Sequence, residues 1–473
     1  MYINGQWING TGSFPVTNPA TGEVIGEVPD CGADEIDAAI TAASEALKSW
    51  RQTTAYERAS LLYRAWEIML ERKQALAELM TREQGKPLKA SLNEVQYGAD
   101  FLLWFAEEAK RVNGQTIPSA RANQRFITQK VPVGVVGAIT PWNYPISMIT
   151  RKLAPALAAG CTLVLKPAEH TPLCARAMAE VFEAAGFPPG VINVISCLDP
   201  KPVGDAFCSD PRVKKLTFTG STAVGKQLNA QAAAQMKRVS MELGGHAPAI
   251  VFPDADPVHA AKGLSLVKFL NTGQACISPN RIFVHEDQAE PFLAELTARA
   301  MRLKAGKGME PGNSIGPLIN EAALGKVDAQ VQDALARGAT LHAGGERLMD
   351  ADLKGGCFYA PTVLSGVTPE MRIYREETFG PVAPVILYRD EDDLLAMAND
   401  TEYGLAAYVY SQNLATAFKA FEALEFGIVG VNDINPTSAA APFGGMKHSG
   451  LGREGAQEGI EEYLETKLGG FAI

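Results

Sequence analysis

The sequence predicts an α/β protein with two parallel-sheet domains and a small additional β segment. Short apolar runs of strand length alternate with helix-like segments between residues 133 and 219. A second series of the same kind follows the double glycine Gly244-Gly245. Strands that alternate with helices favour a parallel sheet covered on both faces. The polar stretch 113–130 interrupts this order, and we expect it to leave the first domain as an excursion.

The first 111 residues are expected to form short strands followed by helices. Asn-Gly and Asn-Pro turn signals divide residues 1–30 into strands. Asp34 is positioned to cap a helix whose apolar residues keep helical spacing. Two long helices are predicted over 56–82 and 88–111, with a Gly-Lys-Pro breaker between them.

The alternating part of the chain predicts strands and helices in sequence order. Strands are expected over 133–140, 162–166, 191–195, 215–219, 249–252, 281–284, 382–387 and 406–410. Helices are expected over 149–159 and 171–185, with two more that end near Leu270 and Leu303. The strand-like segment 463–468 is predicted to pair either with the excursion or with a neighbouring subunit.

Composition and charge exclude several classes of function. With 473 residues, 47% hydrophobic and 20% charged, the chain has ample material for a globular core. A net charge of −10 argues against nucleic-acid binding, which needs a basic face. No run approaches the roughly 18 apolar residues of a membrane span, and no secretory signal pattern is visible. We expect a cytoplasmic protein that does not bind membranes.

The cysteines and histidines indicate a reducing compartment and no metal site. The seven cysteines are an odd number, lie far apart in the chain and include no Cys-x-x-Cys pair. The six histidines are also scattered, without His-Glu-x-x-His spacing. This pattern fits neither a disulfide framework nor a zinc site.

Cys276 is a candidate nucleophile because it lies among small and polar residues between a helix-like and a strand-like run. A thiol on such a turn can meet a substrate. The alternative is ordinary, because free cysteine is most often an inert buried side chain. The surrounding sequence alone does not decide between the two.

Polar residues follow the predicted strands of the first sheet, where ligands bind in parallel α/β folds. Asn143 stands in a turn stiffened by two prolines and could donate to an oxyanion or simply cap the turn. Lys166 and Glu169 could bind a ribose, with the acidic residue favouring NAD over NADP, or form a surface ion pair.

Two further patterns bear on phosphate binding and acid–base chemistry. The stretch 218–226 nearly matches a P-loop, but Gln227 replaces the magnesium-binding hydroxyl, so we reject a nucleoside triphosphatase. A helix N-terminus here can still receive a dinucleotide pyrophosphate. Glu242 lies between apolar neighbours, where desolvation raises a carboxyl pKa and suits a general base, although structural carboxylates also occupy such joints.

Taken together, these stretches resemble the aldehyde dehydrogenase superfamily over nearly the whole chain. Each match is weak alone, but seven occur in the family's order and spacing. They are 140–145 (TPWNYP), 166–169 (KPAE), 218–221 (FTGS), 242–245 (ELGG), 273–276 (GQAC), 377–381 (ETFGP) and 442–445 (PFGG).

The resemblance implies a role for each matching residue. Cys276 would attack the aldehyde, Asn143 and the Cys276 backbone N–H would hold the oxyanion, and Glu242 would activate the water that releases the acid. Lys152 would assist proton relay. The coenzyme would be NAD, with NADP as the alternative. Its binding residues would be Thr140, Pro141, Trp142, Lys166, Glu169, Gly220, Ser221, Glu377 and Phe379.

The resemblance also implies domain roles and assembly. Residues 1–113 and 133–244 would bind the coenzyme as a modified Rossmann domain, and 245–446 would form the catalytic domain. Residues 114–132 and 455–473 would mediate assembly into a homodimer or homotetramer.

Within the superfamily the chain resembles the succinate-semialdehyde dehydrogenase group, through 148–152 (MITRK) and 444–455 (GGMKHSGLGREG). Arg151 could take the distal carboxylate of a semialdehyde acid, assisted by Thr437 or Ser438. Some members have a second arginine where this chain has Leu270, and a second cysteine where it has Ser278. Glutarate semialdehyde, 2-oxoglutarate semialdehyde or broad aliphatic aldehydes are therefore alternative substrates, and no disulfide switch is expected.

Three other functions compete with this prediction. A non-redox cysteine hydrolase or acyltransferase would need an activating histidine, and none lies in the seven matched segments. A CoA-acylating aldehyde dehydrogenase needs no water-activating base, so Glu242 argues against it. A catalytically silent scaffold would not need Cys276, Glu242 and Asn143 together.

Overall fold

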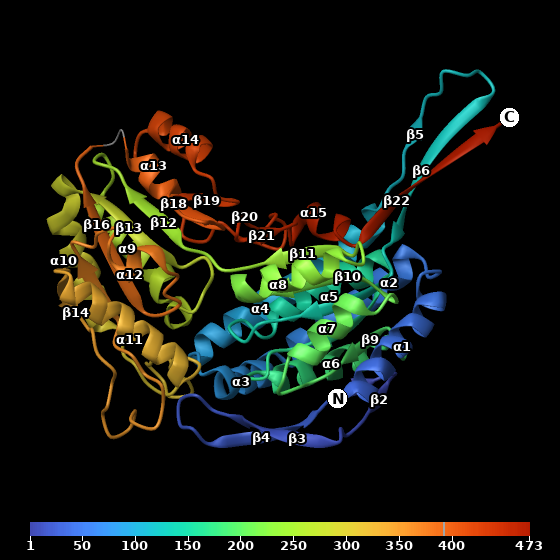
Figure 1. Cartoon of the computed structure of the whole chain (residues 1–473), viewed down its shortest axis with the longest axis horizontal. Coiled ribbons are helices and arrows are strands. Elements are labelled where there is room, and N and C mark those ends of the chain that lie inside the picture. Colours follow the sequence, from blue (N-terminus) through green and yellow to red (C-terminus); the bar gives the residue numbers. More distant parts are fainter. Residues whose placement is uncertain (391–392) are drawn as a thin grey trace.

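The computed structural model describes residues 1–390 and 393–473 and contains two α/β units, each built on its own sheet (Figure 1). The α/β class predicted from the sequence is confirmed. In the first sheet, the order is β2-β1-β9-β8-β7-β10-β11-β21, with five parallel central strands and antiparallel pairs at both edges. Its strands are β1 (Tyr2–Ile3), β2 (Gln6–Trp7), β7 (Val135–Ile139), β8 (Thr162–Lys166), β9 (Ile192–Val194), β10 (Val213–Thr219), β11 (Arg238–Glu242) and β21 (Gly450–Leu451).

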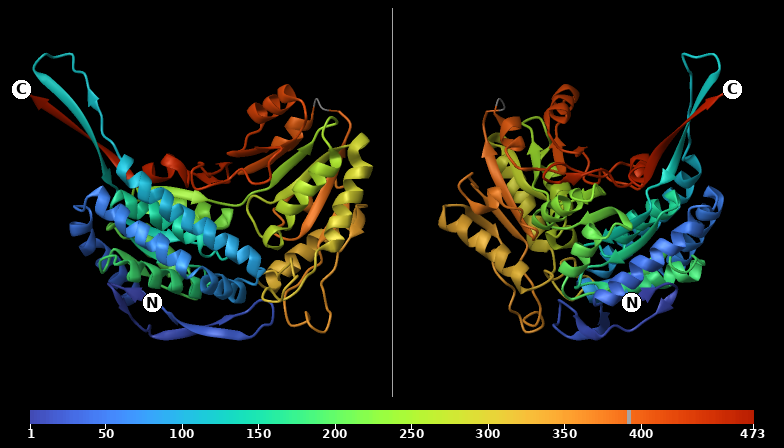
Figure 2. Two further views of the ribbon diagram at one scale, coloured as in Figure 1. Left: turned by 180° about the vertical axis from the view of Figure 1, so that it is seen from behind. Right: turned by 45° about the vertical axis from the view of Figure 1, so that its right-hand side comes forward.

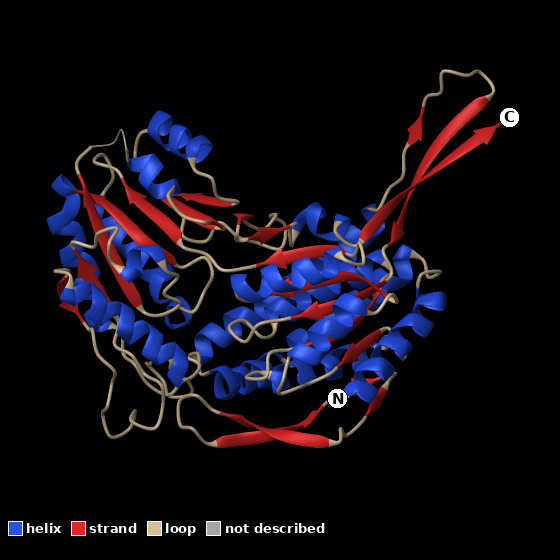
Figure 3. Ribbon diagram, in the orientation of Figure 1, coloured by secondary structure: helices blue, strands red, loops and turns tan. Residues whose placement is uncertain are grey.

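Helices cover both faces of this sheet (Figure 3). Val136 and Leu163 pack in one core with α2 to α6, whereas their neighbours Val135 and Val164 pack in another with α1, α7 and α8. Successive strand side chains point to opposite faces, so a continuous apolar run serves both cores. The helices are α1 (Ala33–Trp50), α2 (Ala55–Glu71), α3 (Lys73–Gln84), α4 (Leu88–Glu108), η1 (Ala109–Arg111), α5 (Ser147–Ala159), α6 (Pro172–Ala185), α7 (Lys201–Ser209) and α8 (Thr222–Ala233).

The second sheet has the order β14-β15-β16-β13-β12-β18-β19 and is parallel except at β14. Gly244 and Gly245 join its first strand to β11 of the first sheet. Its strands are β12 (Ala247–Val251), β13 (Pro279–His285), β14 (Thr340–Ala343), β15 (Thr362–Ser365), β16 (Val382–Tyr388), β18 (Ala406–Tyr410) and β19 (Ile428–Val431). The helices beside it are α9 (Pro257–Phe269), η2 (Leu270–Gly273), α10 (Glu286–Arg302), α11 (Glu321–Ala336), α12 (Arg372–Arg375), α13 (Leu394–Asn399) and α14 (Leu414–Ala423).

A three-stranded arm stands away from both units in every view (Figures 1 and 2). It contains β5 (Thr116–Ile117), β6 (Gln124–Pro132) and β22 (Leu464–Ala472). The excursion predicted at 113–130 is therefore present, and the C-terminal strand pairs with it, antiparallel along the whole of β6. Pairing within the chain was one of the two alternatives left open by the sequence.

Short strands and one helix complete the chain. A hairpin of β3 (Gly12–Thr17) and β4 (Val24–Asp30) runs along the edge of the molecule, where the Pro19 carbonyl accepts from the Cys357 N–H at 3.2 Å. β17 (Tyr403–Gly404) pairs with β20 (Met446–Lys447), and α15 (Ala456–Glu461) precedes the arm.

The structure corrects two details of the helix predictions. The predicted helix 56–82 is two helices, because the backbone at Arg72 (φ −91°, ψ 8°) leaves helical geometry between α2 and α3. Asp34 does not cap α1. Gly32 is the N-cap residue, and its N–H donates to the Glu35 carboxylate at 2.7 Å.

Candidate active site

A sharp turn between α9 and β13 carries Cys276. Asn271, Thr272 and Gly273 all have left-handed backbone (φ 49°, 59° and 73°), which is uncommon for residues other than glycine. At Gly273 a Cβ atom would lie 2.0 Å from the Gly380 carbonyl oxygen, so only glycine fits. The strained turn is thus built into this position and directs the chain toward Cys276.

Buried hydrogen bonds hold the turn in place. The Gln274 side chain donates to the carbonyls of Asn271 and Pro317, both at 3.2 Å, and accepts from the Ile319 N–H at 3.0 Å. The Thr272 hydroxyl donates to the Gly316 carbonyl at 3.1 Å. Fully satisfied buried amides of this kind fix a loop in one conformation.

Asn143 lies directly against the same turn. Its Nδ2 donates to the Gln274 carbonyl at 3.1 Å. The main-chain carbonyl of Asn143 accepts from Asn271 Nδ2 at 2.9 Å and from Lys86 Nζ at 2.7 Å. Lys86 in turn forms a fully buried ion pair with Glu94. The structure therefore brings Asn143 and the Cys276 turn together, as predicted from the sequence. Lys86 contributes to this arrangement, although the sequence indicated it only as part of a helix breaker.

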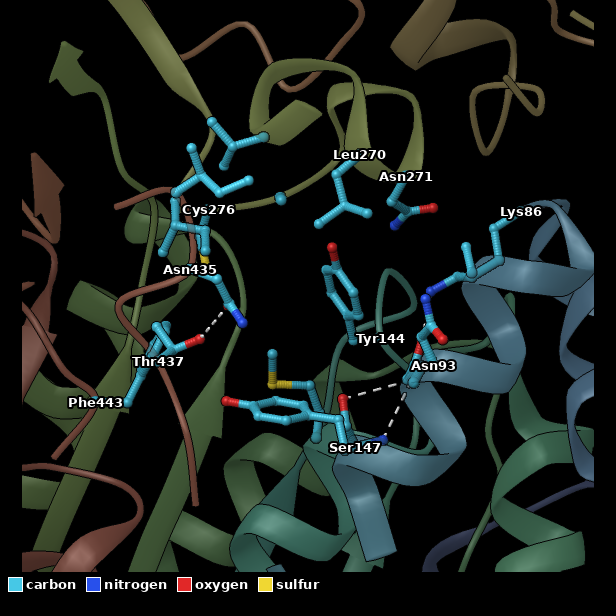
Figure 4. Close-up of a pocket in the computed structure, with 18 of the residues that line it drawn as sticks. Lys86, Asn93, Tyr144, Ser147, Leu270, Asn271, Cys276, Asn435, Thr437 and Phe443 are labelled. Carbon is cyan, nitrogen blue, oxygen red and sulfur yellow. Dashed lines mark hydrogen bonds and ion pairs between the residues drawn. The ribbon is translucent and has the colours of Figure 1, made fainter. Parts of the chain in front are cut away.

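Cys276 lies where two pockets meet. The first pocket has a volume of about 550 Å³ and a largely apolar lining (Figure 4). The second has a volume of about 270 Å³ and opens toward the first sheet. Cys276 and Met148 line both. A sulfur at this junction can contact a ligand in either pocket, which is the arrangement needed to connect a substrate with a coenzyme.

The first pocket contains part of the predicted substrate set. Arg151 and Thr437 line it, and Ser438 does not. Figure 4 shows Thr437 and Phe443 on the same side of this pocket as Asn435, whose Oδ1 accepts from the Thr437 hydroxyl at 3.2 Å.

The second pocket collects most of the predicted coenzyme residues. Gly220 and Ser221 approach it at the start of α8, where Ser221 caps the helix by accepting from the Val224 N–H at 3.4 Å. Free N–H groups and the helix dipole favour a phosphate there. Of the predicted coenzyme residues, those that line this pocket are Pro141, Trp142, Gly220, Ser221, Glu377 and Phe379.

Aromatic and acidic groups shape the end of the second pocket nearest Cys276. The rings of Trp142 and Phe379 meet edge to face at 5.6 Å, and Phe379 has left-handed backbone (φ 55°). Glu377 Oε1 accepts from the Gly245 N–H at 2.8 Å, and burial raises the pKa of this carboxyl.

Thr140, Lys166 and Glu169 lie outside the second pocket, at the ends of β7 and β8. The Thr140 N–H donates to the Lys166 carbonyl at 3.1 Å, and Lys166 Nζ lies 3.2 Å from Glu169 Oε2. Burial opposes ionisation of Glu169, but the hydrogen bond from His170 and the Lys166 charge lower its pKa to about 2. Glu169 is therefore negatively charged at neutral pH.

Burial controls the ionisation of Cys276. Desolvation raises the pKa of the thiol to about 12, the positive charge of Arg151 opposes this, and the nearby Glu242 adds to it. The thiol is thus protonated at neutral pH. A base or a bound group must remove the proton before the sulfur can act as a nucleophile.

Glu242, at the end of β11, is 4% exposed. Among the described residues, neither of its carboxylate oxygens has a hydrogen-bond partner. Burial and the neighbouring Glu454 raise its pKa well above the usual range, while Arg151 and Lys152 oppose the shift. A buried, unsatisfied carboxyl group calls for a functional explanation, and its raised pKa favours a role in proton exchange.

Glu454 was not recognised as a site residue from the sequence, yet it is the centre of the charge network. Lys152 Nζ lies 2.6 Å from Glu454 Oε1 and donates to the Thr217 hydroxyl at 3.1 Å. Arg151 Nε lies 2.9 Å from Glu454 Oε2, an ion pair without hydrogen-bond alignment. Lys152 itself lines neither pocket. Its signal in the sequence is the Gly-Arg-Glu-Gly motif, which contributes to the family resemblance but indicates no role for Glu454.

Within the part of the chain that the structure describes, no group of three or more His, Cys, Asp or Glu side chains could hold a metal ion. None of the helices described is long and apolar enough to cross a membrane.

Comparison with known proteins identifies the family. The model of the aldehyde dehydrogenase family matches residues 7–468. The chain belongs to the aldehyde dehydrogenase family. It is accordingly an oxidoreductase that oxidises an aldehyde with a nicotinamide coenzyme, NAD(P).

Several aldehyde dehydrogenases are similar over their full length. Succinate-semialdehyde dehydrogenase [NADP(+)] of Escherichia coli (strain K12) is 50% identical over 98% of this chain and 96% of its own. Glutarate-semialdehyde dehydrogenase of Pseudomonas aeruginosa is 48% identical over 99% and 97%. The crystal structure of succinate-semialdehyde dehydrogenase from Burkholderia pseudomallei superposes with a TM-score of 0.97 at 49% identity, covering 100% of this chain and 97% of that one.

Proposed function

We propose that the physiological substrate is a semialdehyde acid, with succinate semialdehyde as the first candidate. The observation that carries this proposal is the position of Cys276 between the first pocket, which contains Arg151, and the second pocket, which collects the coenzyme residues. Relatives named as succinate-semialdehyde dehydrogenases support it. Glutarate semialdehyde is the second candidate, because relatives named for it are nearly as similar. In addition, Leu270 stands where some succinate-semialdehyde dehydrogenases have a second arginine, so Arg151 has no second cation beside it at that position.

Cys276 is the proposed nucleophile. Once deprotonated, its sulfur adds to the aldehyde carbon, and the Asn143 amide with the Cys276 backbone N–H holds the resulting oxyanion. The coenzyme, when bound in the second pocket, would accept the hydride that the former aldehyde carbon loses, which leaves the acyl group on Cys276 as a thioester. Glu242 then takes a proton from water, which attacks the Cys276 thioester, releases the carboxylic acid and returns the sulfur as the leaving group.

Lys152 and Glu454 are the proposed proton route beyond Glu242. Their contact at 2.6 Å supports this role, as does the effect of both charges on the pKa of Glu242. Arg151 contributes a positive charge beside the sulfur and lines the first pocket, although Glu454 already compensates part of that charge.

NAD is the proposed preferred coenzyme. The remaining predicted residues, Thr140, Lys166 and Glu169, would hold the adenosine ribose beyond the second pocket. The ionised Glu169 carboxylate favours a free 2′-hydroxyl and repels a 2′-phosphate.

We further propose that the arm mediates assembly into homodimers or homotetramers in the cytoplasm. Exposed apolar side chains on its strands support this role, namely Ile117, Ile127, Leu468 and Phe471. In this proposal residues 1–113 and 133–244 bind the coenzyme, residues 245–446 carry catalysis, and residues 114–132 and 455–473 form the contact between subunits. Light scattering of the purified protein gives its mass in solution, and a monomer would contradict the proposal.

The substrate proposal is tested by a panel of aldehydes crossed with both coenzymes, without CoA. Succinate semialdehyde should give the highest kcat/KM, followed by glutarate semialdehyde. The variant Arg151→Gln should raise KM more for these semialdehyde acids than for uncharged aldehydes. Equal kcat/KM for charged and uncharged aldehydes would reject a semialdehyde acid as the substrate.

A further inference from the structure

A third cavity, with a volume of about 430 Å³, adjoins the first pocket. We call it the vestibule. The two cavities share part of their lining, namely Ala90, Asn93, Leu266, Leu270 and Asn271. In Figure 4, Asn93, Leu270 and Asn271 lie across the first pocket from Thr437 and Phe443. The vestibule therefore shares a wall with the pocket that contains Cys276.

The vestibule carries a concentration of positive charge. Lys89, Arg299 and Arg302 line it, and no carboxylate occurs among the described residues of its lining. Arg299 Nε lies 2.6 Å from Glu295 Oε1, so that charge is compensated. Arg302 only donates to the Ala298 carbonyl of its own helix at 2.9 Å, and Lys89 has no ionic or hydrogen-bonding partner within the described chain. Two uncompensated cations thus face this cavity in a protein of net charge −10.

The first pocket offers no comparable charge. Its two cations already have carboxylate partners, Lys86 with Glu94 and Arg151 with Glu454. Leu270, on the wall between the cavities, is 44% exposed and carries no charge. Among the described residues, the uncompensated cations of the two cavities therefore line the vestibule and not the first pocket.

We propose that the vestibule is an anion-capturing entrance, in which Lys89 and Arg302 attract aldehydes that carry a carboxylate or sulfonate and deliver them to the first pocket. The inference rests on the proposed function, because it requires an anionic substrate. Clefts lined by one sign of charge raise the local concentration and the association rate of oppositely charged ligands. The effect weakens with salt, because the Debye length is about 10 Å at 0.1 M ionic strength.

Kinetics of the double variant Lys89→Gln/Arg302→Gln test the inference. At low ionic strength its kcat/KM for succinate semialdehyde should fall about threefold to tenfold, as for lost electrostatic steering, with kcat unchanged. The salt dependence should flatten, and an uncharged aldehyde of similar length should be unaffected. The matched control is Lys48→Gln/Lys201→Gln, which removes two exposed charges from α1 and α7. An equal loss for charged and uncharged aldehydes, or an equal loss in the control, would overturn the inference.

Alkylation of Cys276 separates this inference from the proposed function. Iodoacetate and iodoacetamide differ mainly in charge, and the labelled Cys276 peptide can be quantified by mass spectrometry without substrate or coenzyme. The iodoacetate-to-iodoacetamide rate ratio should fall in Lys89→Gln/Arg302→Gln and stay constant in the control. If the wild type prefers uncharged aldehydes but the ratio still falls, the vestibule attracts anions, but the substrate proposal fails and with it the role of the vestibule in substrate capture. An unchanged ratio rejects the vestibule whatever the substrate is.

Discussion

Lys86 Nζ lies 2.7 Å from the main-chain oxygen of Asn143, so a buried ammonium group fixes the strand end that presents the Asn143 amide. The same lysine pairs with Glu94, which accepts from the N–H groups of Ile146 and Ser147 at 3.0 and 3.2 Å. One buried ion pair thus links the helix breaker before α4 to the start of α5.

Lys86→Met should therefore reduce both stability and turnover. Removing one partner of a buried ion pair typically costs about 3–5 kcal/mol, because the other charge stays buried and unpaired. The free energy of unfolding in urea and kcat should both fall. Changing Glu94 to Gln in the same chain should recover part of the stability. No loss in Lys86→Met would mean that water already compensates Glu94.

The alkylation rate of Cys276 in the free enzyme should rise steeply with pH. The thiol has a pKa of about 12, and only the thiolate reacts. Between pH 7 and 9 the rate constant with iodoacetamide should increase about tenfold per pH unit, as expected for a thiol titrating well above this range. Arg151→Met should slow alkylation further, because Arg151 lowers this pKa. A plateau below pH 8 would show that the sulfur is already ionised.

Glu242→Gln should block release of the acid while leaving acylation largely intact. The amide keeps the shape of the side chain but cannot take a proton from water. Rapid mixing should then show a burst of reduced coenzyme close to the enzyme concentration, followed by very slow turnover. A full steady-state rate would remove Glu242 from the proposed hydrolytic step.

Glu454→Gln should shift the pH dependence of turnover to lower pH. The negative charge of Glu454 raises the pKa of Glu242, so its removal lowers that pKa and ionises the base at lower pH. The ascending limb of kcat against pH should move toward acid. Glu462→Gln is the control, because Glu462 pairs with the buried Lys215 instead. An equal shift of the ascending limb in both variants would show that the charge of Glu454 does not specifically control this pKa. Thermal unfolding of the same samples reports any loss of stability independently.

Glu169→Gln should weaken the preference for NAD. Without the negative charge that the low pKa maintains, a 2′-phosphate is no longer repelled. KM for NAD should rise and KM for NADP should fall. Unchanged values for both coenzymes would remove Glu169 from the ribose site.

Much of the fold and part of the site could be predicted from local patterns. The strands 162–166 and 406–410 match β8 and β18 at both ends, because uninterrupted apolar runs bounded by turn signals mark buried parallel strands. Cys276 was predictable as a candidate nucleophile on a turn, although the structure buries its thiol. The break at Arg72 was not, since helical periodicity continues through it and tertiary packing determines where the chain bends.

The charge network lay beyond local patterns altogether. Glu454 pairs with Lys152, 302 residues away, and Lys86 donates to the main-chain oxygen of Asn143, 57 residues away. Nothing near Glu454 or Lys86 in the sequence indicates these partners. Burial also turned Arg151 from an expected free ligand for a carboxylate into a group already paired within the protein. Such partnerships follow from the assembled topology, in which β21 returns to pair with β11.

The contact between Lys152 and Glu454 spans 302 residues of sequence. During synthesis, α5 emerges long before the segment that neutralises Arg151 and Lys152. A nascent chain therefore has to keep these two cations hydrated until the segment around Glu454 has left the ribosome. We therefore expect the surroundings of Glu242, the proposed base, to form late in folding, because long-range contacts form slowly.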